Sequence, residues 1–465
     1  MIKFGTGGFR GIIGDDFTKE NVQKIAQGLA NISKEEKNHK AILIGYDYRF
    51  MSDVAAKWIA EVLAANKIKV LLYTEAMPTP AILSSTVDRG LKYGVMITAS
   101  HNPYFYNGVK LFADNQDADE VFTKRMEDII NQELEVKTMR YEEALNQGLI
   151  KLFTDKRKYL KKIESFVTLN NNRKDIRIFY DNLHGVGAKC IMPIYKKMGV
   201  SLKTLHIEHD TMFGGVDPNP KKDTILKLKD KVLNEGYDYL IGTDSDSDRL
   251  AIVDDKGEFI SSNEIMAALY YYLVKYQGQK GDIVKNLATS LLLDKLAEKC
   301  GFKCHTVDVG FKNISLGIKE HDALLGGESS GGLTIRGYIF AKDSVFSSTL
   351  FLDMVLHMKK KVSEIVKEVK DFAGYDGAFI EGEVRFIDRD KVYKYLVENT
   401  PKFSKKILKK EIIGANIKYI FEDGWALYRF SGTEAVCRVY TETLNKREAE
   451  PLMKEVIEYF NLIEK

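Results

Sequence analysis

"KAILIGYD", residues 40–47, is a short and almost wholly apolar run, which is typical of a strand buried on both faces of a sheet. "IKVLLYT" (68–74) and "YGVMITAS" (93–100) are further runs of the same kind. The segments between them differ, because "NVQKIAQGLANIS" (21–33) and "SDVAAKWIAEVLAANK" (52–67) have the apolar period of amphipathic helices. Helices that alternate with buried strands predict an α/β domain with a mainly parallel sheet.

The same alternation begins again near residue 175 and once more near residue 263. The tail differs, because its apolar residues alternate as they do in antiparallel strands before a closing helix at 447–465. We therefore predict an α/β protein with three topologically similar mixed-sheet α/β domains and a smaller C-terminal α+β domain around a central cleft. The expected bounds are residues 1–155 (domain I), 156–258 (domain II), 259–375 (domain III) and 376–465 (domain IV).

The composition of the whole chain narrows the functional classes. The 465 residues are 45% hydrophobic and 29% charged, and the net charge of +3 gives no electrostatic reason for a nucleic acid or membrane partner. "MIKFGTGGFRG" lacks the apolar core of a signal peptide, and no stretch approaches the roughly 20 apolar residues of a membrane span. We expect a cytoplasmic monomer or homodimer with four free thiols, at Cys190, Cys300, Cys304 and Cys437.

Ser100 lies in "ITASHNP" (97–103), where a predicted strand gives way to a loop. Ligands of open α/β sheets gather beyond the carboxyl ends of strands. An isolated S-H-N-P is usually a turn whose serine makes a local hydrogen bond. Acyl transfer is disfavoured, because adjacent side chains on extended backbone point apart and no G-x-S-x-G surrounds Ser100. A serine that carries a phosphoryl group stays open.

A second loop, "GTDSDSDRLAIVD" (242–254), carries aspartates at alternate positions after an apolar strand. Asp244, Asp246 and Asp248 can converge if the loop curls around a cation, and hard carboxylate oxygens suit Mg²⁺. An EF-hand would need a longer loop with glycine and a terminal glutamate. The alternative is a solvated acidic turn, since aspartate favours turns. Arg249 adds a fixed positive charge beside the aspartates.

Two further loops carry polar residues suited to a phosphorylated sugar. "LLGGESSGGLT" (324–334) offers Glu328 and hydroxyls on a glycine-rich backbone that a ligand can approach closely. "YRFSGTEAVCRVY" (428–440) offers two arginines together with Ser431, Gly432 and Thr433, a set able to cradle a phosphate. Either loop alone is also compatible with a plain turn. Because each predicted domain supplies one such loop, the four together indicate a phosphosugar site where the domains meet.

The set of motifs resembles the α-D-phosphohexomutase superfamily, the phosphoglucomutase/phosphomannomutase enzymes. "FGTGGFRG" (4–11) is similar to the N-terminal signature, "TASHNPYFYNGVK" (98–110) to the phosphoserine loop and "TDSDSDR" (243–249) to the metal loop. "GESSGG" (327–332) is similar to the sugar loop and "RFSGTE" (429–434) to the phosphate loop. The motifs follow the family order over essentially the whole chain.

The resemblance implies a role for each matching residue. Ser100 would be the phosphoserine, and Mg²⁺ would be held by the three aspartates and an oxygen of the Ser100 phosphate. Arg10, Lys110 and His101 would lie at the transferring group, with Lys110 as general acid/base, for which we expect a lowered pKa from nearby cations. The residues expected to bind substrate are Arg249, Lys312, Glu328, Ser330, Arg429, Ser431, Gly432, Thr433 and Arg438.

The sequence departs from the family pattern in small ways. Ser245 and Ser247 stand in the metal loop where small residues such as glycine are common, with the aspartate spacing intact. Gly332 ends the sugar loop where many dual glucose/mannose enzymes have histidine, which favours glucose-type members without deciding the sugar. Phe430 and Ala435 replace two prolines, so that the phosphate loop is less preset by its backbone.

The expected reaction moves phosphate between the 1- and 6-hydroxyls of a hexose, with glucose as the first choice, through phospho-Ser100 and a hexose 1,6-bisphosphate that also activates the enzyme. Three alternatives stay open. They are a mutase for mannose, glucosamine or a pentose phosphate, a non-catalytic phosphosugar-binding protein, and a metal-dependent phosphatase. No Walker-type G-x-x-x-x-G-K-[ST] motif is present, so a nucleotide-dependent kinase is disfavoured.

Overall fold

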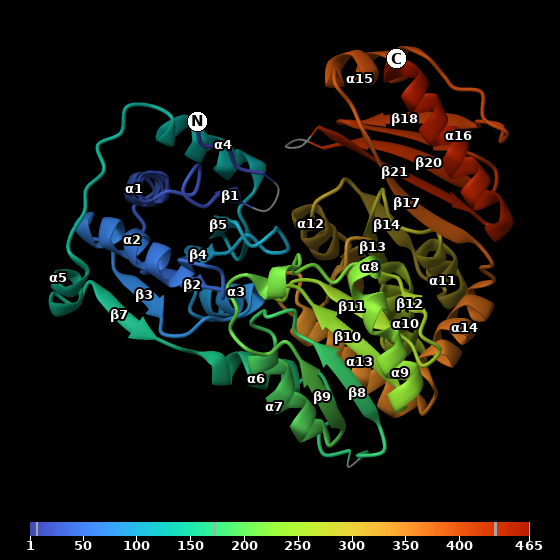
Figure 1. Cartoon of the computed structure of the whole chain (residues 1–465), viewed down its shortest axis with the longest axis horizontal. Helices are drawn as coiled ribbons and strands as arrows, with labels where there is room; N and C mark the ends of the chain where they lie inside the picture. Colours follow the sequence, from blue (N-terminus) through green and yellow to red (C-terminus); the bar gives the residue numbers. More distant parts are fainter. Residues whose placement is uncertain (6–7, 172, 432–434, 465) are drawn as a thin grey trace.

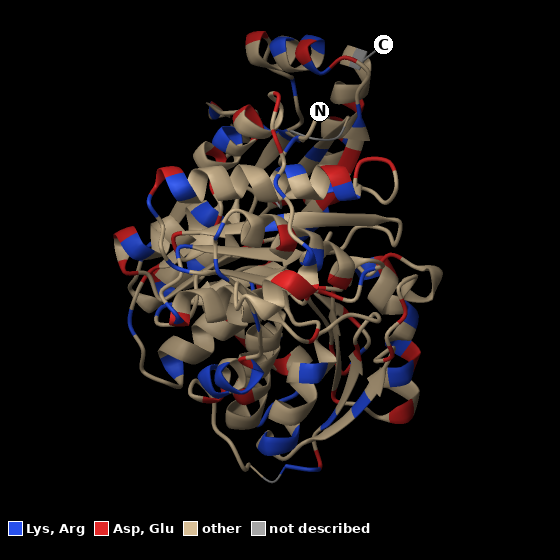
Figure 2. Ribbon diagram, turned by 90° about the vertical axis from the view of Figure 1, so that its left-hand side faces the viewer, with Lys and Arg blue, Asp and Glu red and all other residues tan. Residues whose placement is uncertain are grey.

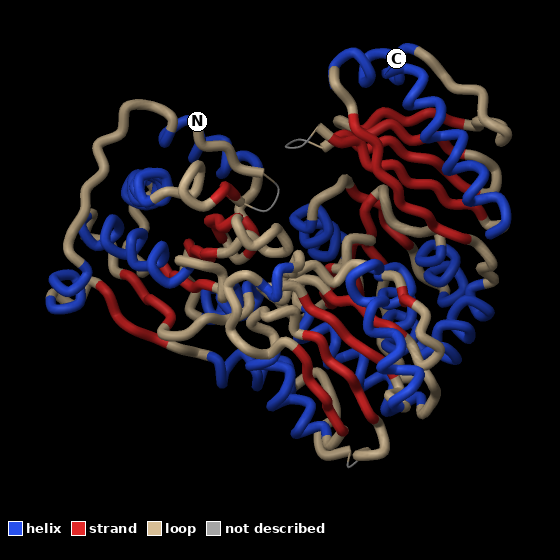
Figure 3. Tube along the Cα trace, in the orientation of Figure 1, coloured by secondary structure: helices blue, strands red, loops and turns tan. Residues whose placement is uncertain are grey.

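The computed structural model describes residues 1–5, 8–171, 173–431 and 435–464. It contains four β-sheets that follow one another in chain order around the molecule (Figure 1). Helices cover the sheets, as the blue and red segments of Figure 3 show. Three sheets mix parallel and antiparallel strands and the fourth is antiparallel, which confirms the predicted fold class. The predicted domain bounds stay predictions.

The first sheet has the strand order β1-β5-β4-β2-β3-β7, with β6 beside β5. The three runs that open the sequence are β2, β3 and β4, and they pair in parallel. β5 adds to β4 antiparallel, and β1 to β5. The strands are β1 (Phe9–Ile12), β2 (Ile42–Tyr46), β3 (Val70–Tyr73), β4 (Tyr93–Ile97), β5 (Tyr106–Ala113), β6 (Gln116–Asp117) and β7 (Ile150–Phe153). The helices are α1 (Lys19–Glu35), α2 (Ser52–Ala65), α3 (Thr79–Asp88), α4 (Glu120–Ile130), α5 (Tyr141–Asn146) and α6 (Lys156–Glu164).

The second sheet has the order β12-β11-β10-β8-β9, in which β8, β9 and β10 are parallel. α7 ends at Met198, because the following Gly199 takes the left-handed conformation (φ 79°) that closes a helix. The strands are β8 (Arg177–Asp181), β9 (Ser201–Leu205), β10 (Tyr239–Thr243), β11 (Leu250–Val253) and β12 (Phe259–Ile260). The helices are α7 (Ala188–Met198), α8 (Lys222–Ile225) and α9 (Lys229–Glu235), with 3₁₀ turns at Phe213–Gly215 and Leu226–Leu228.

The third sheet has the order β14-β13-β15-β16, with β16 antiparallel to β15. α13 has no amphipathic period in its sequence, because this helix is apolar almost all round and nearly all of its residues are buried. The strands are β13 (Ile283–Asn286), β14 (Cys304–Val307), β15 (Leu325–Glu328) and β16 (Gly332–Ile335). The helices are α10 (Ser262–Lys275), α11 (Leu292–Cys300), α12 (Phe311–His321), α13 (Ser344–Met358) and α14 (Val362–Ala373).

The fourth sheet is wholly antiparallel, in the order β17-β21-β20-β19-β18, and it packs its own core against α15 and α16. Its strands are β17 (Ala378–Arg385), β18 (Lys409–Ile413), β19 (Asn416–Ile420), β20 (Gly424–Phe430) and β21 (Val436–Thr443). Its helices are α15 (Arg389–Glu398) and α16 (Lys446–Glu464). In Figure 1 this sheet lies beside the third sheet, at the upper right.

Domains I to III share one large apolar core, which runs from Leu43 on β2 to Tyr375 after α14. On the ribbon drawn in Figure 2, positive and negative residues are interspersed. Among the described residues we find no helix with the length and apolar character needed to cross a bilayer. The four candidate loops follow the carboxyl ends of four strands, since Ser100, Asp244, Glu328 and Ser431 come at or just after the ends of β4, β10, β15 and β20.

Candidate active site

Ser100 lies in a tight and buried turn. Its φ is 50°, in the left-handed region that residues other than glycine adopt rarely, and the residue is 3% exposed. The Ser100 backbone N–H donates to Thr98 Oγ1 at 2.8 Å. The turn directs Ser100 Oγ out of domain I, toward the aspartate loop of domain II.

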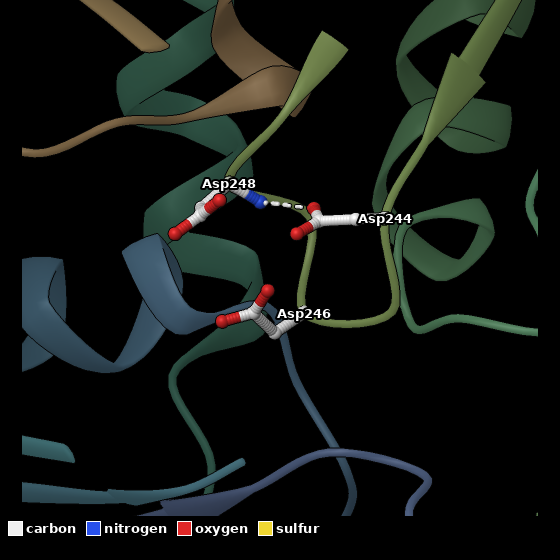
Figure 4. A group of neighbouring side chains, drawn as sticks. All are labelled: Asp244, Asp246 and Asp248. Carbon is white, nitrogen blue, oxygen red and sulfur yellow. Dashed lines mark hydrogen bonds between the residues drawn. The ribbon is translucent and has the colours of Figure 1, made fainter. Parts of the chain in front are cut away.

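The three aspartates of that loop converge, as the sequence predicts. One carboxylate oxygen from each of Asp244, Asp246 and Asp248 lies within 4.8 Å of the others, and all three residues are buried (Figure 4). The backbone N–H groups of Asp248 and Arg249 each donate to Asp244 Oδ1 at 2.9 Å, which curls the loop. Gly185 backs this loop from domain II, where a Cβ would lie within 3 Å of the Asp244 and Ser245 carbonyl oxygens.

Ser100 and the aspartate loop meet directly. Ser100 Oγ donates to Asp244 Oδ2 at 2.9 Å, and Ser245 Oγ donates to the Ser100 carbonyl at 2.6 Å. The first residue of α3, Thr79, holds the other side of the loop, because its Oγ1 donates to Asp246 Oδ2 at 2.6 Å and its N–H to the Asp246 carbonyl at 2.9 Å. Two segments of domain I, the Ser100 turn and the start of α3, therefore form hydrogen bonds with the aspartate loop of domain II.

The aspartate cluster fits a divalent cation. Asp246 Oδ1 and Asp248 Oδ1 are buried and have no hydrogen-bond partner in the part of the chain that the structure describes. Burial and the adjacent carboxylates of Asp248 and Asp246 raise the pKa of Asp244 well above its ordinary value. Unpartnered carboxylate oxygens held close together are what Mg²⁺ prefers, since this cation takes hard oxygen ligands. The residues present therefore match the predicted cofactor.

Lysines from two domains surround Asp248. Lys110 Nζ lies 3.8 Å from Asp248 Oδ2 and 3.4 Å from Asp117 Oδ1, and Lys342 Nζ lies 3.3 Å from Asp248 Oδ2. Burial by itself would raise the pKa of Asp248, but Lys342 and Lys110 outweigh it and the pKa falls below its usual value. Lys342, on the loop before α13, brings a third domain to the site.

The charged groups of the chain act on the pKa of Lys110 in both directions, and the expected lowering by Mg²⁺ and Arg10 stays a prediction. Burial lowers the pKa of the Lys110 ammonium, but the carboxylates of Asp117, Asp248 and Asp246 outweigh burial and raise it above its ordinary value. Arg10, one of the two cations expected to lower this pKa, has a smaller effect than these carboxylates. The sequence could not reveal this balance, because Asp117 reaches Lys110 only through the β5–β6 turn.

Arg10 and His101 also lie at the site. Arg10, on β1, donates from Nη1 to Asn102 Oδ1 at 2.6 Å, and burial lowers the pKa of its guanidinium. His101 Nδ1 lies 3.2 Å from Ser100 Oγ. Burial, together with the positive charges of Arg249 and Arg10, holds the pKa of His101 well below its ordinary value. The imidazole is therefore neutral at neutral pH and stands beside Ser100 as a hydrogen-bonding group.

The predicted sugar-binding residues occupy domain III. Glu328, at the end of β15, accepts from Asn286 Nδ2 at 2.9 Å and from the Gly310 N–H at 3.0 Å, so its carboxylate is fixed in orientation. Ser330 is exposed, and its Oγ lies 3.5 Å from Glu328 Oε2. Lys312, near the start of α12, forms an ion pair across to domain I, where its Nζ lies 2.9 Å from Glu120 Oε1.

The predicted phosphate-binding residues of domain IV are described in part. Arg429 on β20 pairs with Arg438 on β21 in the sheet register, so the two arginines stand side by side on neighbouring strands. Ser431 follows β20, and its N–H donates to the Val436 carbonyl at 2.9 Å. The predicted Gly432 and Thr433 lie outside the described residues. The described part therefore keeps both arginines of this loop near one another.

Four residues at or around the site had no predicted role. Asp47 and Arg49 follow β2 and contact the Ser100 loop, Thr79 binds Asp246, and Lys342 binds Asp248. One sequence signal was available, because Asp47 and Arg49 lie beyond the carboxyl end of a predicted buried strand, as Ser100 and Asp244 do. Lys342 gave no such signal, since it precedes a helix.

Models of one protein family match the chain in four successive parts. The matches are to the phosphoglucomutase/phosphomannomutase alpha/beta/alpha domains I, II and III, at residues 1–137, 157–257 and 261–372, and to the C-terminal domain of the same family at residues 394–459. The chain belongs to the phosphoglucomutase/phosphomannomutase family. The predicted membership of this family is thereby confirmed, and enzymes of this family are intramolecular phosphotransferases, a kind of isomerase.

Members of the family with different names resemble the chain over nearly its full length. The phosphoglucomutase/phosphomannomutase of Thermococcus kodakarensis is 26% identical over 96% of this chain and 95% of its own. The phosphoglucosamine mutase of Nautilia profundicola is 28% identical over 99% of both chains. A solved structure from Thermus thermophilus superposes with a TM-score of 0.86 at 25% identity, covering 99% of both chains.

Proposed function

We propose that this protein interconverts a hexose 1-phosphate and the corresponding hexose 6-phosphate, with Ser100 as the phosphoryl carrier. Supporting evidence comes from one contact above all, the 2.9 Å hydrogen bond from Ser100 Oγ to Asp244 Oδ2. It joins a hydroxyl held in a constrained turn to a buried carboxylate cluster from another domain. A serine in a plain turn would need neither the left-handed backbone nor unpartnered carboxylate oxygens beside it.

In the proposed reaction, phospho-Ser100 transfers its phosphoryl group to the free sugar hydroxyl. The Oγ–P bond breaks, an O–P bond forms on the sugar, and the hydroxyl proton ends on Ser100 Oγ. Lys110, an ammonium in this environment, donates a proton to Oγ and recovers one from the hydroxyl. The resulting hexose 1,6-bisphosphate then returns its other phosphoryl group to Ser100 by the same steps in reverse. An added hexose 1,6-bisphosphate would prime Ser100 in the same way.

The remaining residues bind and orient. Arg10 and the neutral His101 flank the transferring group, and Arg249 lies beside it. Glu328 and Ser330 bind sugar hydroxyls, and Lys312 with the domain IV loop (Arg429, Ser431, Gly432, Thr433 and Arg438) binds the phosphate that does not react. Mg²⁺, held by the three aspartates and a phosphate oxygen of Ser100, would neutralise charge on the phosphoryl group, where most phosphoryl-transfer catalysis lies.

The identity of the sugar is a separate matter, and the expected preference for glucose finds no support in the comparisons. The relatives carry the names phosphoglucosamine mutase and phosphoglucomutase/phosphomannomutase at about the same identity. We therefore propose a hexose phosphate as the substrate class. Rates with the 1-phosphates of glucose, mannose and glucosamine, each with its 1,6-bisphosphate present, would rank the three sugars. A cytoplasmic location and a monomeric or dimeric state remain predictions.

The phosphoserine assignment has a direct test. Intact-mass analysis of the full chain, incubated with hexose 1,6-bisphosphate and Mg²⁺, should show one added phosphate that Ser100→Ala lacks and that Ser165→Ala, a control on the surface after α6, retains. Ser100→Ala should also lose mutase turnover. Full turnover in Ser100→Ala would reject the assignment. If the wild type is phosphorylated and releases phosphate to water without isomerising sugar phosphates, the protein is a phosphatase. If it binds sugar phosphates and catalyses neither reaction, it is a non-catalytic binding protein.

A further inference from the structure

A buried arginine of domain I, Arg49, lies behind the Ser100 turn. Arg49 follows β2, is 2% exposed, and donates every hydrogen bond of its two terminal nitrogens to one short loop. Nη1 donates to the carbonyls of Pro103 and Tyr106, both at 2.9 Å. Nη2 donates to the Asn102 carbonyl at 2.6 Å and to the Ser100 carbonyl. Four backbone carbonyls of residues 100–106 thus point at one guanidinium.

This convergence needs a cation, because carbonyl dipoles that share one point repel each other unless a positive charge lies between them. A planar guanidinium offers five N–H donors in a fixed geometry, which a single ammonium cannot match. The contacts also compensate for the backbone strain at Ser100, whose φ of 50° is unfavourable for a serine. The turn that aims Oγ at Asp244 therefore depends on a group that never touches Oγ.

Asp47 completes the support from the other side. Its Oδ2 accepts from Thr98 Oγ1 at 2.7 Å, and the same Thr98 Oγ1 accepts the Ser100 backbone N–H at 2.8 Å. Asp47 Oδ1 accepts the Arg49 N–H at 3.1 Å, and Asp47 Oδ2 lies 3.7 Å from Arg49 Nε. The carboxylate thus fixes the N–H side of Ser100 while the guanidinium fixes its C=O side.

Domain II contacts the same support. The Phe213 ring, which is buried, lies 5.0 Å from the Arg49 guanidinium carbon. Ser245, between two of the aspartates, donates to the Ser100 carbonyl at 2.6 Å, which is the carbonyl that Arg49 Nη2 also contacts. This one oxygen is therefore shared between the arginine support and the metal loop, so that a change in either alters where Ser100 lies relative to Asp244.

We propose that Arg49, paired with Asp47, is a positioning residue for phosphoryl transfer, which holds Ser100 in the turn that presents Oγ to the aspartate cluster. The inference rests on the proposed function, since it assigns Arg49 a part in the reaction of Ser100. The hydrogen bonds of the Arg49 guanidinium all go to backbone carbonyls and none goes to Ser100 Oγ. Loss of Arg49 should therefore lower kcat and leave KM nearly unchanged, because substrate binding belongs to other loops.

The test compares Arg49→Lys with Arg125→Met, a control in α4 whose ion pairs with Glu35 and Glu36 lie away from the site. Both variants are measured in the full chain with Mg²⁺ and hexose 1,6-bisphosphate, for kcat, KM, thermal midpoint and the rate at which Ser100 gains phosphate. In Arg49→Lys we expect kcat and the phosphorylation rate to fall together by about 100-fold, the cost of a small misplacement of reacting atoms. Arg125→Met should change neither. Unchanged kcat in Arg49→Lys, or a raised KM with unchanged kcat, would overturn the inference.

A double-mutant cycle separates positioning from general loss of stability. Ser245→Ala removes the second donor to the Ser100 carbonyl, and we expect kcat to fall by about 10-fold, the worth of one buried hydrogen bond. Because both groups act on one oxygen, the double variant should lose less than the product of the two single losses; independent effects would contradict the proposal. If Arg49→Lys does not fold, Ser245→Ala alone decides, since an unaltered phosphorylation rate would exclude control through this carbonyl.

Phosphorylation of Ser100 in wild type and in Arg49→Lys separates a failure of the proposed function from a failure of the positioning role of Arg49. If the wild-type chain never gains phosphate on Ser100, the proposed function fails first. If the wild type gains phosphate and Arg49→Lys gains it at the same rate, the positioning role fails while the proposed function stands.

Discussion

Two clusters built around buried carboxylates lie at domain boundaries of this molecule, and they are built in opposite ways. Between domains I and II, the aspartate cluster leaves Asp246 Oδ1 and Asp248 Oδ1 without partners in the described chain. Between domains III and IV, Glu442 on β21 is fully buried and accepts from four donors. Three of these donate at 2.7 to 2.8 Å: the Leu291 N–H, the Tyr375 hydroxyl and Trp425 Nε1. The fourth donor is Ser290 Oγ.

The difference separates a binding role from a structural one. A buried carboxylate costs free energy unless its oxygens are hydrogen-bonded, so a fully satisfied one such as Glu442 serves to hold domain IV against α11 of domain III. The aspartate cluster keeps part of this cost, because two of its oxygens have no hydrogen-bond partner in the described chain while the three carboxylates lie close together (Figure 4). Lys110 and Lys342 offset part of the negative charge at Asp248, and the two unpartnered oxygens fit the divalent cation that we propose.

The largest effect is expected at the unsatisfied cluster. Asp246→Asn keeps the shape but removes one charged ligand, so we expect turnover with Mg²⁺ to fall by at least about 100-fold, because metal assistance supplies several kcal/mol at the transition state. Without divalent cation the variant should be as stable as wild type or more so, since like charges are relieved. Thermal melts in chelator and kinetic assays across Mg²⁺ concentrations provide the measurement. Wild-type turnover that persists in chelator would refute the metal site.

A substitution at Glu442, whose oxygens are all hydrogen-bonded, should instead lower the stability of the fold. Glu442→Gln leaves an amide among four donors, and its NH₂ group faces hydrogen atoms instead of accepting them. We expect a loss of about 4 kcal/mol in unfolding free energy, since hydrogen bonds to a charged group contribute roughly 1.5–3 kcal/mol each and only some are replaced. Denaturant unfolding gives the value, with the exposed Glu450→Gln on α16 as control. If Glu442→Gln leaves the unfolding free energy unchanged, the distinction between the two clusters does not hold.

The sequence predicts the position of each loop but not the contacts between loops. Apolar runs such as residues 40–47 and 93–100 are local signals, and the loops that follow them inherit their place at the strand ends. Contacts between loops depend on strand pairing that no local pattern encodes. Arg10 reaches Asn102 because β1 pairs with β5, and Lys342 reaches Asp248 because domain III packs on domain II.

Electrostatic contacts within the site depend on the same strand pairing. The turn that follows β5 brings Asp117 Oδ1 to 3.4 Å from Lys110 Nζ, and this carboxylate raises the pKa of Lys110, a contribution that the sequence did not reveal. Arg49 shows the limit most clearly. Arg49 donates to backbone carbonyls, which every residue has. The residue types of the loop therefore do not predict this contact.

A further buried carboxylate, Asp343, is expected to make the stability of the protein depend on pH. Asp343, the N-cap of α13, accepts from the Tyr159 and Tyr338 hydroxyls and the Phe346 N–H, yet burial outweighs these bonds and raises its pKa to about 6. A raised carboxyl pKa means that the folded state prefers the protonated form. The stability contributed by Asp343 is therefore full below about pH 4 and lost as pH rises through about 6.

Asp343→Asn, which cannot ionise, should reveal this loss. We expect the unfolding free energy of wild type minus that of the variant to fall by about 2 kcal/mol between about pH 4 and pH 7. Denaturant melts of both proteins at several pH values measure the difference. If the unfolding free energies of the two proteins change in parallel with pH, ionisation of Asp343 does not affect stability. Its hydrogen bonds alone, as at Glu442, would then determine the free-energy cost of burying this carboxylate.

The smallest effect is expected where an acidic group is neither buried nor fully bonded. Glu120, at the start of α4, is 84% exposed and pairs across domains with Lys312, a proposed phosphate ligand. An incoming phosphate and this carboxylate would compete for one ammonium. Glu120→Gln should therefore lower KM by about 2- to 3-fold at low salt with kcat unchanged, and added salt should abolish the difference, as for any exposed ion pair. Lys124→Gln in the same helix, whose ion pairs are with Glu127 and Asp128, should leave KM unchanged. If Glu120→Gln leaves KM unchanged at low salt, then either Lys312 binds substrate without competition from Glu120, or Lys312 does not bind substrate. Lys312→Gln separates these two cases, because it should raise KM only in the first.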